Sequence, residues 1–300
     1  MRFSCKLVFL AGFFTVFLLE ANAKLPTKNS FKEKLSHLET KFNGKIGVYA
    51  VDSKTNQILA YRADERFPMQ STLKLMGVAA LLKLSESNPS LLQEKIKYTQ
   101  KDLDSWHPIT GIKLNTGMTL EELAAATISY SDNPAINLIL KKFGGPKFST
   151  NFARSIDNKT YNLIHYDGAF LNSNPDQEAD TVTPKDMAIS TQKILLGNVL
   201  SPKQRNLLTG WMVNNTTGYK RIRAGVPISW TVADKTGSGS YGIANDVGII
   251  WSPACKPIIL AIYTVRNSNK LAAKEDIIAD TTALVLEEFA KSNTCFKNGY

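Results

Sequence analysis

Apolar residues recur at helical spacing in residues 31–42, and Asn29 or Ser30 can cap a helix that begins there. Residues 45–52 and 57–62 are rich in residues that favour β-strands, and the polar segment between them is short enough for a hairpin. The folded part of the chain is therefore predicted to begin with a helix followed by two antiparallel strands.

The pattern of apolar positions changes after these strands. Residues 71–208 have mostly helical spacing interrupted by polar stretches, whereas strand-like runs return at residues 230–234, 246–251 and 258–265. A last helical pattern covers residues 274–289. The final three strands are joined by connections too short for helical crossovers, so their pairing is predicted to be antiparallel.

Together these elements predict an α/β fold of the α+β type, in which helices flank a five-stranded antiparallel sheet and an all-α domain is inserted. We expect residues 24–62 and 213–300 to form one discontinuous α/β domain, and residues 63–212 to form the all-α domain. Because ligands favour clefts between domains, the active site is expected between the two.

The first 23 residues have the features of an export signal. Arg2 and Lys6 precede a mostly apolar run over residues 7–19, and Ala21 and Ala23 are the small residues that a signal peptidase accepts. The run is too short to span a bilayer comfortably. We therefore expect cleavage after Ala23, no stable membrane insertion afterwards, and a bacterial protein that is periplasmic or secreted.

The formal net charge of the whole chain is +10, and removal of the signal, with two positive residues and one negative residue, leaves about +9. The longest basic segment, residues 220–223, is short, and no basic patch is interleaved with aromatic residues. We interpret the charge as an aid to solubility and expect no nucleic-acid partner.

The cysteines fit an exported protein. Cys5 leaves with the signal, and Cys255 and Cys295 remain in an oxidising compartment, where disulfides persist. If the last helix packs back antiparallel on the last strand, its end returns near the start of that strand. Cys295 then lies close to Cys255, and we predict that the two form a disulfide.

A serine and a lysine three residues apart are candidates for nucleophilic catalysis. Ser71 and Lys74 open a predicted helix just after Pro68, and on a helix the amine can reach the hydroxyl at this spacing. A serine needs a base to become a nucleophile, and a desolvated lysine near other cations loses its proton more easily. Alone, this spacing is a weak signal because it occurs by chance on many helices.

Two further motifs make the pattern specific. Residues 131–133 read S-D-N before an apolar helix, and residues 235–237 read K-T-G at the end of an apolar run. The ordered set S-x-x-K, S-D-N and K-T-G is the signature of class A β-lactamases and penicillin-binding proteins. Residues 116–119, 215–218 and 222–227 also resemble class A β-lactamases, so the similarity covers nearly all of the mature chain and implies the fold shared by those enzymes.

The resemblance implies a role for each motif residue. Ser71 would attack the lactam carbonyl, and the backbone N–H groups of Ser71 and Ser238 would form the oxyanion hole. Ser131 would pass a proton to the lactam nitrogen, assisted by Lys74 and Lys235. The residues implied in substrate binding are Trp106, Asn133, Asn172, Arg221, Lys235, Thr236, Gly237 and Ser238.

One loop departs from the family pattern. In the family, a glutamate in the sequence E-x-x-L-N activates the water that hydrolyses the acyl-enzyme, but the corresponding residues 165–172 contain no glutamate. Alignment on Leu171 and Asn172 puts Gly168 in its place, whereas counting without gaps puts Asp167 there, which we prefer. Aspartate falls roughly 1.3–1.5 Å short of glutamate. Since misplacement on this scale can cost about a hundredfold in rate, we expect slow deacylation.

Two neighbouring positions in this loop differ as well. In the preferred register, Leu171 replaces the asparagine that holds the water in the family, and the adjacent Asn172 is the candidate substitute. His165 would face Asp180, where the family uses an arginine. A salt bridge of the loop is therefore hypothesised to depend on pH.

The resemblance to carbapenem-hydrolysing members is partial. Arg221 and Ser238 correspond to residues that support the binding of the substrate carboxylate in that subset. Those enzymes also join the residue before the nucleophile to a residue after K-T-G by a disulfide, but Gln70 and Gly239 occupy these positions here. Carbapenem hydrolysis is therefore left open.

Three functions are compatible with the sequence. The first is a β-lactam hydrolase; the second is a penicillin-binding carboxypeptidase or an acyl-trapping β-lactam binder with little turnover; the third is a secreted binding module with a vestigial site. No zinc-binding spacing, α/β-hydrolase elbow or phosphate loop occurs, so no metal or organic cofactor is implied. We expect small-molecule β-lactams as partners and a monomeric protein.

Overall fold

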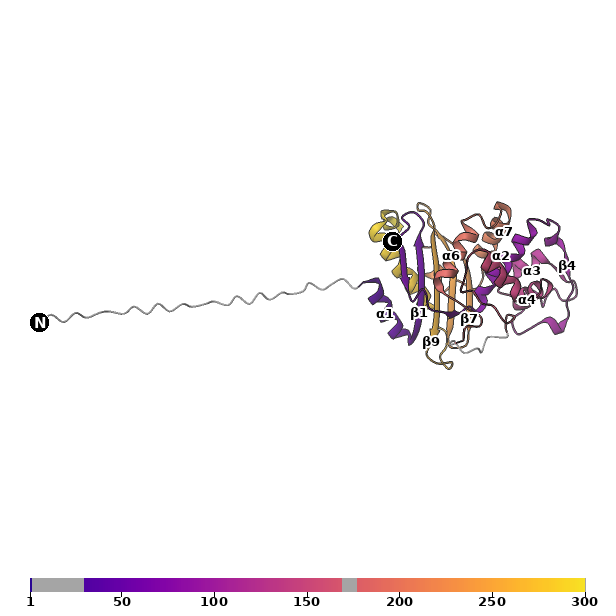
Figure 1. Ribbon diagram of the computed structural model, residues 1–300, viewed down its shortest axis with the longest axis horizontal. Coiled ribbons are helices and arrows are strands. Elements are labelled where there is room, and N and C mark those ends of the chain that lie inside the picture. Colours follow the sequence, from indigo (N-terminus) through magenta and orange to yellow (C-terminus); the bar gives the residue numbers. More distant parts are fainter. Residues whose placement is uncertain (2–29, 169–176, 300) are drawn as a thin grey trace.

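The computed structural model describes residue 1 and residues 30–168 and 177–299 (Figure 1). Its central element is a sheet with the strand order β2, β1, β9, β8, β7, and every neighbouring pair is antiparallel. The five-stranded antiparallel sheet expected from the sequence is thus confirmed. The strands are β1 (Gly44–Asp52), β2 (Ile58–Tyr61), β7 (Thr231–Gly239), β8 (Ile243–Trp251) and β9 (Ile258–Arg266).

Strands from the two ends of the chain meet in the middle of this sheet. Strand β1 pairs with β9 along its whole length, from Gly44 opposite Arg266 to Asp52 opposite Ile258. The helical block between them in sequence is therefore an insertion between strands of one sheet. Strand β7 is longer than the predicted strand because its ladder with β8 continues to Gly239, so the K-T-G residues lie inside the strand.

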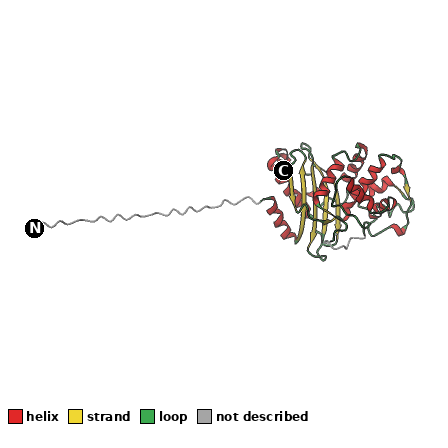
Figure 2. Ribbon diagram, viewed as in Figure 1, coloured by secondary structure: helices red, strands yellow, loops and turns green. Residues whose placement is uncertain are grey.

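Helices cover both faces of the sheet (Figure 2). On one face α1 (Phe31–Phe42) and α8 (Asp276–Ser292) form an apolar cluster with side chains of the strands, and α6 (Pro184–Leu195) packs on the other face. Burial from both sides explains why β9 is buried at every position from Ile258 to Val265. The first helix has the predicted bounds, and Ser30 caps it by accepting a hydrogen bond from the backbone N–H of Glu33.

The remaining helices form a block on the side of the sheet away from α1 (Figure 1). Helix α2 (Leu73–Ser85) is apolar almost all round and nearly fully buried, as expected for a helix at the centre of a bundle. It contacts all four of the other helices in the block. These helices are α3 (Leu120–Ser129), α4 (Asn133–Lys142), α5 (Lys147–Ser155) and α7 (Pro202–Val213).

Short elements connect the block to the sheet. Two-residue strands pair as β3 (Phe67–Pro68) with β6 (Thr181–Val182) and as β4 (Lys95–Ile96) with β5 (Met118–Thr119). Ser71 does not begin an α-helix as predicted, because residues 70–72 form a 3-10 turn directly before α2. The 3-10 turns are η1 (Gln70–Thr72), η2 (Leu91–Gln93), η3 (Gln100–Asp102), η4 (Ile222–Gly225) and η5 (Thr294–Gly299).

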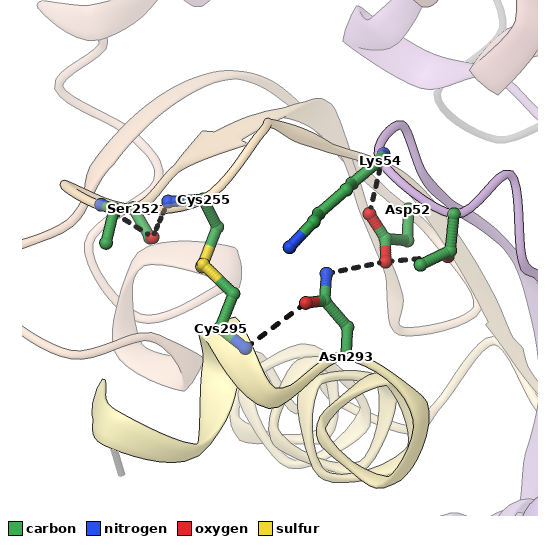
Figure 3. The surroundings of a disulfide bond; sticks show 8 residues. Asp52, Lys54, Ser252, Cys255, Asn293 and Cys295 are labelled. Carbon is green, nitrogen blue, oxygen red and sulfur yellow. Dashed lines mark hydrogen bonds between the residues drawn. A yellow bond between two sulfur atoms is a disulfide. The ribbon is translucent and has the colours of Figure 1, made fainter.

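A disulfide joins the connection between β8 and β9 to the segment after α8 (Figure 3). Cys255 and Cys295 have Cα atoms 5.8 Å apart, so the pairing expected from the sequence is present. Close by, the side-chain amide of Asn293 donates a hydrogen bond of 2.9 Å to Asp52, which lies at the end of β1. The C-terminal segment is thereby fixed by a covalent bond to the β8–β9 connection and by a polar contact to the end of β1.

The expected signal peptide, residues 1–23, lies outside the described residues except for Met1. Within the described part of the chain, no helix has the length and apolar character needed to cross a membrane. The division into two domains at residues 62–63 and 212–213 remains a prediction.

Candidate active site

The side chains of Ser71 and Lys74 are in direct contact. Ser71 lies in the turn η1, one residue after Gln70. The φ of Gln70 is 48°, which is a left-handed conformation. The Lys74 Nζ atom donates a hydrogen bond of 2.8 Å to the Ser71 Oγ atom. The contact that the three-residue spacing predicted is therefore formed, although a 3-10 turn and the start of α2 provide it together.

The Lys74 amine is fully buried and surrounded by acceptors. Its Nζ atom donates to Ser131 O at 2.7 Å, Ser131 Oγ at 3.1 Å and Asn133 Oδ1 at 2.6 Å, and it forms an ion pair with Asp167 Oδ2 at 2.6 Å. Burial lowers the pKa of Lys74, and the carboxylate of Asp167 is the main influence opposing that shift. Lys74 is therefore less basic than an exposed lysine and lies in contact with groups that can exchange a proton with it.

A second buried amine reaches the same serine. Lys235 Nζ donates to Ser131 Oγ at 3.1 Å and to Thr236 O at 2.9 Å. Burial lowers the pKa of Lys235 well below its usual value, and the charge of Lys74 lowers it further. The Ser131 hydroxyl thus lies between two buried lysines whose pKa values are both lowered.

The S-D-N turn is held by a carboxylate to which the sequence assigned no role. Asp132 caps α4 by accepting from the N–H of Ala135 at 3.0 Å, and its other oxygen accepts from the N–H groups of Ile109 and Thr110 at 2.9 Å each. These bonds fix Ser131, which has a φ of 56°, on the side of the turn that faces the lysines. The N-cap position of Asp132 was the available signal for this role.

The K-T-G strand approaches the nucleophile closely. A Cβ atom at Gly237 would lie 2.8 Å from Met69 O and 3.2 Å from the backbone nitrogen of Ser71, so only glycine fits here. This contact brings β7 beside η1. The two N–H groups expected to form the oxyanion hole, those of Ser71 and Ser238, therefore belong to segments that touch.

Arg221 connects the end of this strand to α8. Its NH1 group donates to Gly237 O at 2.8 Å and to Asn245 O at 2.7 Å, and its NH2 group donates to Ser238 Oγ at 2.6 Å. Its Nε–H donates to Glu275 at 2.9 Å. Glu275, which precedes α8 and lines the cleft, was missed by the sequence reasoning because no motif contains it.

The structure brings Asp167, the preferred choice over Gly168, into contact with Lys74. Asn137 holds its backbone from both sides: the Asn137 amide donates to Asp167 O at 2.9 Å, and the Asp167 N–H donates to Asn137 Oδ1 at 2.8 Å. Gly168 has a φ of 90°, which an L residue adopts only with strain. Asn172 and Leu171 lie outside the described residues. The clamp by Asn137 was not foreseen from the sequence.

His165 faces Asp180, as hypothesised. Its Nδ1 atom is 2.6 Å from Asp180 Oδ2, and the backbone N–H groups of His165 and Ile164 donate to Asp180 Oδ1. The backbone oxygen of Asp180 accepts from the N–H of Met69 at 2.8 Å, two residues before the nucleophile. The contact thus links the loop that carries Asp167 to the segment that carries Ser71.

Ser71 and Ser131 line a cleft of about 360 Å³. Trp106 is about half exposed at its rim, and its Nε1–H donates to Tyr130 O at 3.1 Å. Among the described residues, no group of His, Cys, Asp and Glu side chains is arranged to hold a metal ion. The predicted site residues that line the cleft are Ser71, Trp106, Ser131, Asn133, Arg221, Thr236, Gly237 and Ser238.

The chemistry of these contacts defines a class of protein. A serine hydroxyl in contact with a buried lysine, with a second serine and a second lysine beside them, is equipped for acyl transfer through a covalent serine intermediate. Asp167, bound to the first lysine, is a candidate general base for a hydrolytic step. The fold and the site therefore describe a serine acyl-transfer enzyme of the hydrolase type.

Comparisons with known proteins identify the family. The model of the beta-lactamase enzyme family matches residues 30–289. "Beta-lactamase 3" of Bacillus cereus is 45% identical over 89% of this chain and 84% of its own length. "Beta-lactamase OXY-2" of Klebsiella oxytoca is 41% identical over 90% of this chain and 93% of its own length. A crystal structure of a β-lactamase from Streptosporangium roseum aligns with a TM-score of 0.85 and 37% sequence identity. The alignment covers 87% of this chain and 98% of the other. The chain belongs to the beta-lactamase enzyme family.

Proposed function

We propose that this protein hydrolyses β-lactams through an acyl-enzyme on Ser71 and so confers β-lactam resistance. The observation that carries the proposal is the hydrogen-bonded cluster of Ser71, Lys74, Ser131 and Lys235, which we call the three-motif cluster. It contains a nucleophile, a buried amine to take its proton and a second hydroxyl to deliver a proton to the leaving nitrogen.

In the proposed acylation, Lys74 first gives a proton to Asp167 across their 2.6 Å contact. The neutral amine then takes the Ser71 proton while Oγ attacks the lactam carbonyl, and the N–H groups of Ser71 and Ser238 stabilise the oxyanion. As the lactam C–N bond breaks, Ser131 gives its proton to the nitrogen and receives one from Lys74. Asp167 finally returns its proton to Lys74, and the acyl-enzyme remains.

In the proposed deacylation, the ionised Asp167 takes a proton from water while the water oxygen attacks the acyl carbon. The bond between that carbon and Ser71 Oγ then breaks, and the proton returns to Oγ through Lys74. Because Asp167 is one methylene shorter than glutamate, we expect this step to be slower than acylation.

The substrate is proposed to bind along β7. Lys235, Thr236 and Arg221 would bind its carboxylate, Arg221 through the Ser238 hydroxyl that it already contacts. Asn133 would bind the side-chain amide, because its Oδ1 accepts from Lys74 and its NH2 group therefore points away from that lysine. Trp106 at the rim would cover the side chain, and Asn172 is proposed to contribute from its loop.

Purified protein, nitrocefin and benzylpenicillin test the proposal in one experiment. We expect sustained nitrocefin turnover, and intact mass spectrometry should find a benzylpenicilloyl adduct on Ser71 that is absent from a Ser71→Ala variant. A stoichiometric burst with no further turnover would instead favour the penicillin-binding or acyl-trapping alternative, for which the short Asp167 is the supporting observation. No turnover and no adduct would refute both. Imipenem rates measured alongside decide whether carbapenems are substrates.

The cellular setting is part of the proposal. We propose that residues 1–23 direct export and are cleaved, that the mature enzyme acts in the periplasm or outside the cell as a monomer, and that the two predicted domains form the cleft. A mass that begins at Lys24 in the exported fraction supports cleavage, whereas an intact N-terminus there would refute it.

A further inference from the structure

A carboxylate outside the three motifs lies unpaired beside the active site. Asp104, in the loop before the cleft-lining Trp106, uses its Oδ1 atom to accept the Trp106 N–H at 2.8 Å. Its Oδ2 atom is shielded from solvent and has no hydrogen-bond partner among the described residues. Burying an acceptor without a donor is unfavourable, so the position of this oxygen lowers stability and suggests a functional role.

Its neighbours place Oδ2 beside Gly168 and close to Asn133, which lines the cleft. A Cβ atom built on Gly168 would lie 2.9 Å from Asp104 Oδ2 and 3.9 Å from Asn133 Nδ2. The carboxylate therefore fills the space that a side chain at residue 168 would take, next to the amide proposed to bind the substrate side chain. The loop is held there because Trp106 O accepts the N–H of Asn133 at 3.1 Å.

The charge of Asp104 is not neutralised locally. Within residues 30–168 and 177–299, no lysine, arginine or histidine forms an ion pair with it, whereas Asp102, two residues earlier, pairs with Lys141 at 3.3 Å. The field of Asp104 extends into the site, since its charge is one of those that raise the pKa of Lys74 against the effect of burial. Asp104 is partly buried and its Oδ2 atom is shielded from solvent, so its charge is screened less than that of a fully exposed carboxylate.

We propose that Asp104 selects substrates by the charge on their acylamino side chain, favouring an ammonium group and disfavouring a carboxylate at the carbon next to the amide. The inference rests on the proposed β-lactam hydrolysis and on the proposed contact of Asn133 with the substrate amide. Asp104 acts through its field rather than by contact, because its free oxygen is covered. Lys74, the lysine whose pKa the charge of Asp104 raises, is already paired with Asp167.

Three penicillins that differ only at this carbon test the inference: ampicillin carries an ammonium group, benzylpenicillin a hydrogen and carbenicillin a carboxylate. We measure kcat/KM for each at pH 6, where the ampicillin amine is protonated. Asp104→Asn keeps the shape and removes the charge, so the ratio of ampicillin to carbenicillin should fall roughly tenfold. Benzylpenicillin should change least.

Asp102→Asn is the matched control, because it removes an equal charge from the same loop at a paired position. We expect it to leave the ratio unchanged. Asp104→Ser, checked by circular dichroism, gives a second neutral variant if the asparagine does not fold. An unchanged ratio in a folded Asp104 variant, or an equal shift in the Asp102 control, overturns the inference and leaves the proposed function standing. Failure of the wild-type protein to hydrolyse any of the three penicillins overturns the proposed function itself.

Discussion

The three-motif cluster and the loop of residues 165–168 differ in how their parts are held. In the cluster, Lys74 and Lys235 both reach Ser131 directly, and each motif lies in or next to a helix or strand that forms the core. In the loop, Asn137 of α4 holds the backbone of Asp167, Lys74 pairs with its carboxylate, and His165 contacts Asp180 at the start of the loop. The difference teaches that the proposed acylation rests on secondary structure, while the proposed deacylation rests on a few side-chain contacts.

The largest effect should come from the cluster. Ser71→Ala removes the nucleophile, and we expect nitrocefin turnover to fall roughly 10⁴-fold or more. The covalent benzylpenicilloyl mass should disappear as well. A Ser36→Ala variant, changed at an exposed position on α1, should keep the wild-type rate. If the adduct persisted in Ser71→Ala, another residue would be the nucleophile.

The second-largest effect should come from Asp167 in the loop, and it should fall mainly on deacylation. Asp167→Asn keeps the size of the side chain but removes the proposed base, so deacylation should slow by about a hundredfold. Intact mass spectrometry should then show the acyl-enzyme accumulating during turnover. Because Asp167 also exchanges a proton with Lys74 in our proposal, single-turnover kinetics should show a smaller loss in acylation. Equal turnover in the variant and the wild-type protein would remove Asp167 from the mechanism.

A smaller effect on deacylation is expected from Asn137, which holds the backbone of Asp167. Asn137→Ala deletes both hydrogen bonds to the backbone of Asp167 and leaves its carboxylate in place. Deacylation should fall by about tenfold, in line with two lost hydrogen bonds, while the acylation rate stays within twofold of wild type. Asn88→Ala, at an exposed site far from the cleft, serves as the control. A parallel loss in both steps would show that α4 itself had shifted.

The smallest effect concerns the contact between His165 and Asp180. His165 Nδ1 lies 2.6 Å from Asp180 Oδ2, and the side chain of His165 is about half exposed. His165→Ala removes this contact, so deacylation should slow by about threefold, the size expected for a partly exposed pair, while acylation stays within about twofold of wild type. His37→Ala removes a histidine from α1 and should leave both rates unchanged. Equal deacylation rates in His165→Ala and the wild-type protein would contradict the role of this contact.

The order of the motifs was enough to predict the cluster. The spacing of Ser71 and Lys74 indicates a contact because a helix brings such residues together, and the sheet follows from strand-like runs joined by short connections. The same local information predicted the bounds of α1 and the pairing of Cys255 with Cys295. These features depend on short-range periodicity and chain connectivity, which can be read directly along a sequence.

Contacts between distant segments needed the tertiary structure. Counting could favour Asp167 over Gly168, but only packing shows that its carboxylate lies 2.6 Å from Lys74. The hydrogen bond from Arg221 to Glu275 joins residues that are 54 positions apart in the sequence. Asp104 lies beside Gly168, which is 64 positions later in the sequence. Such contacts depend on how helices and loops pack in three dimensions, and no periodic pattern encodes them. The sequence by itself therefore determined the fold and the residues of the three-motif cluster, whereas the tertiary structure decided how the proposed base is held and which charges surround it.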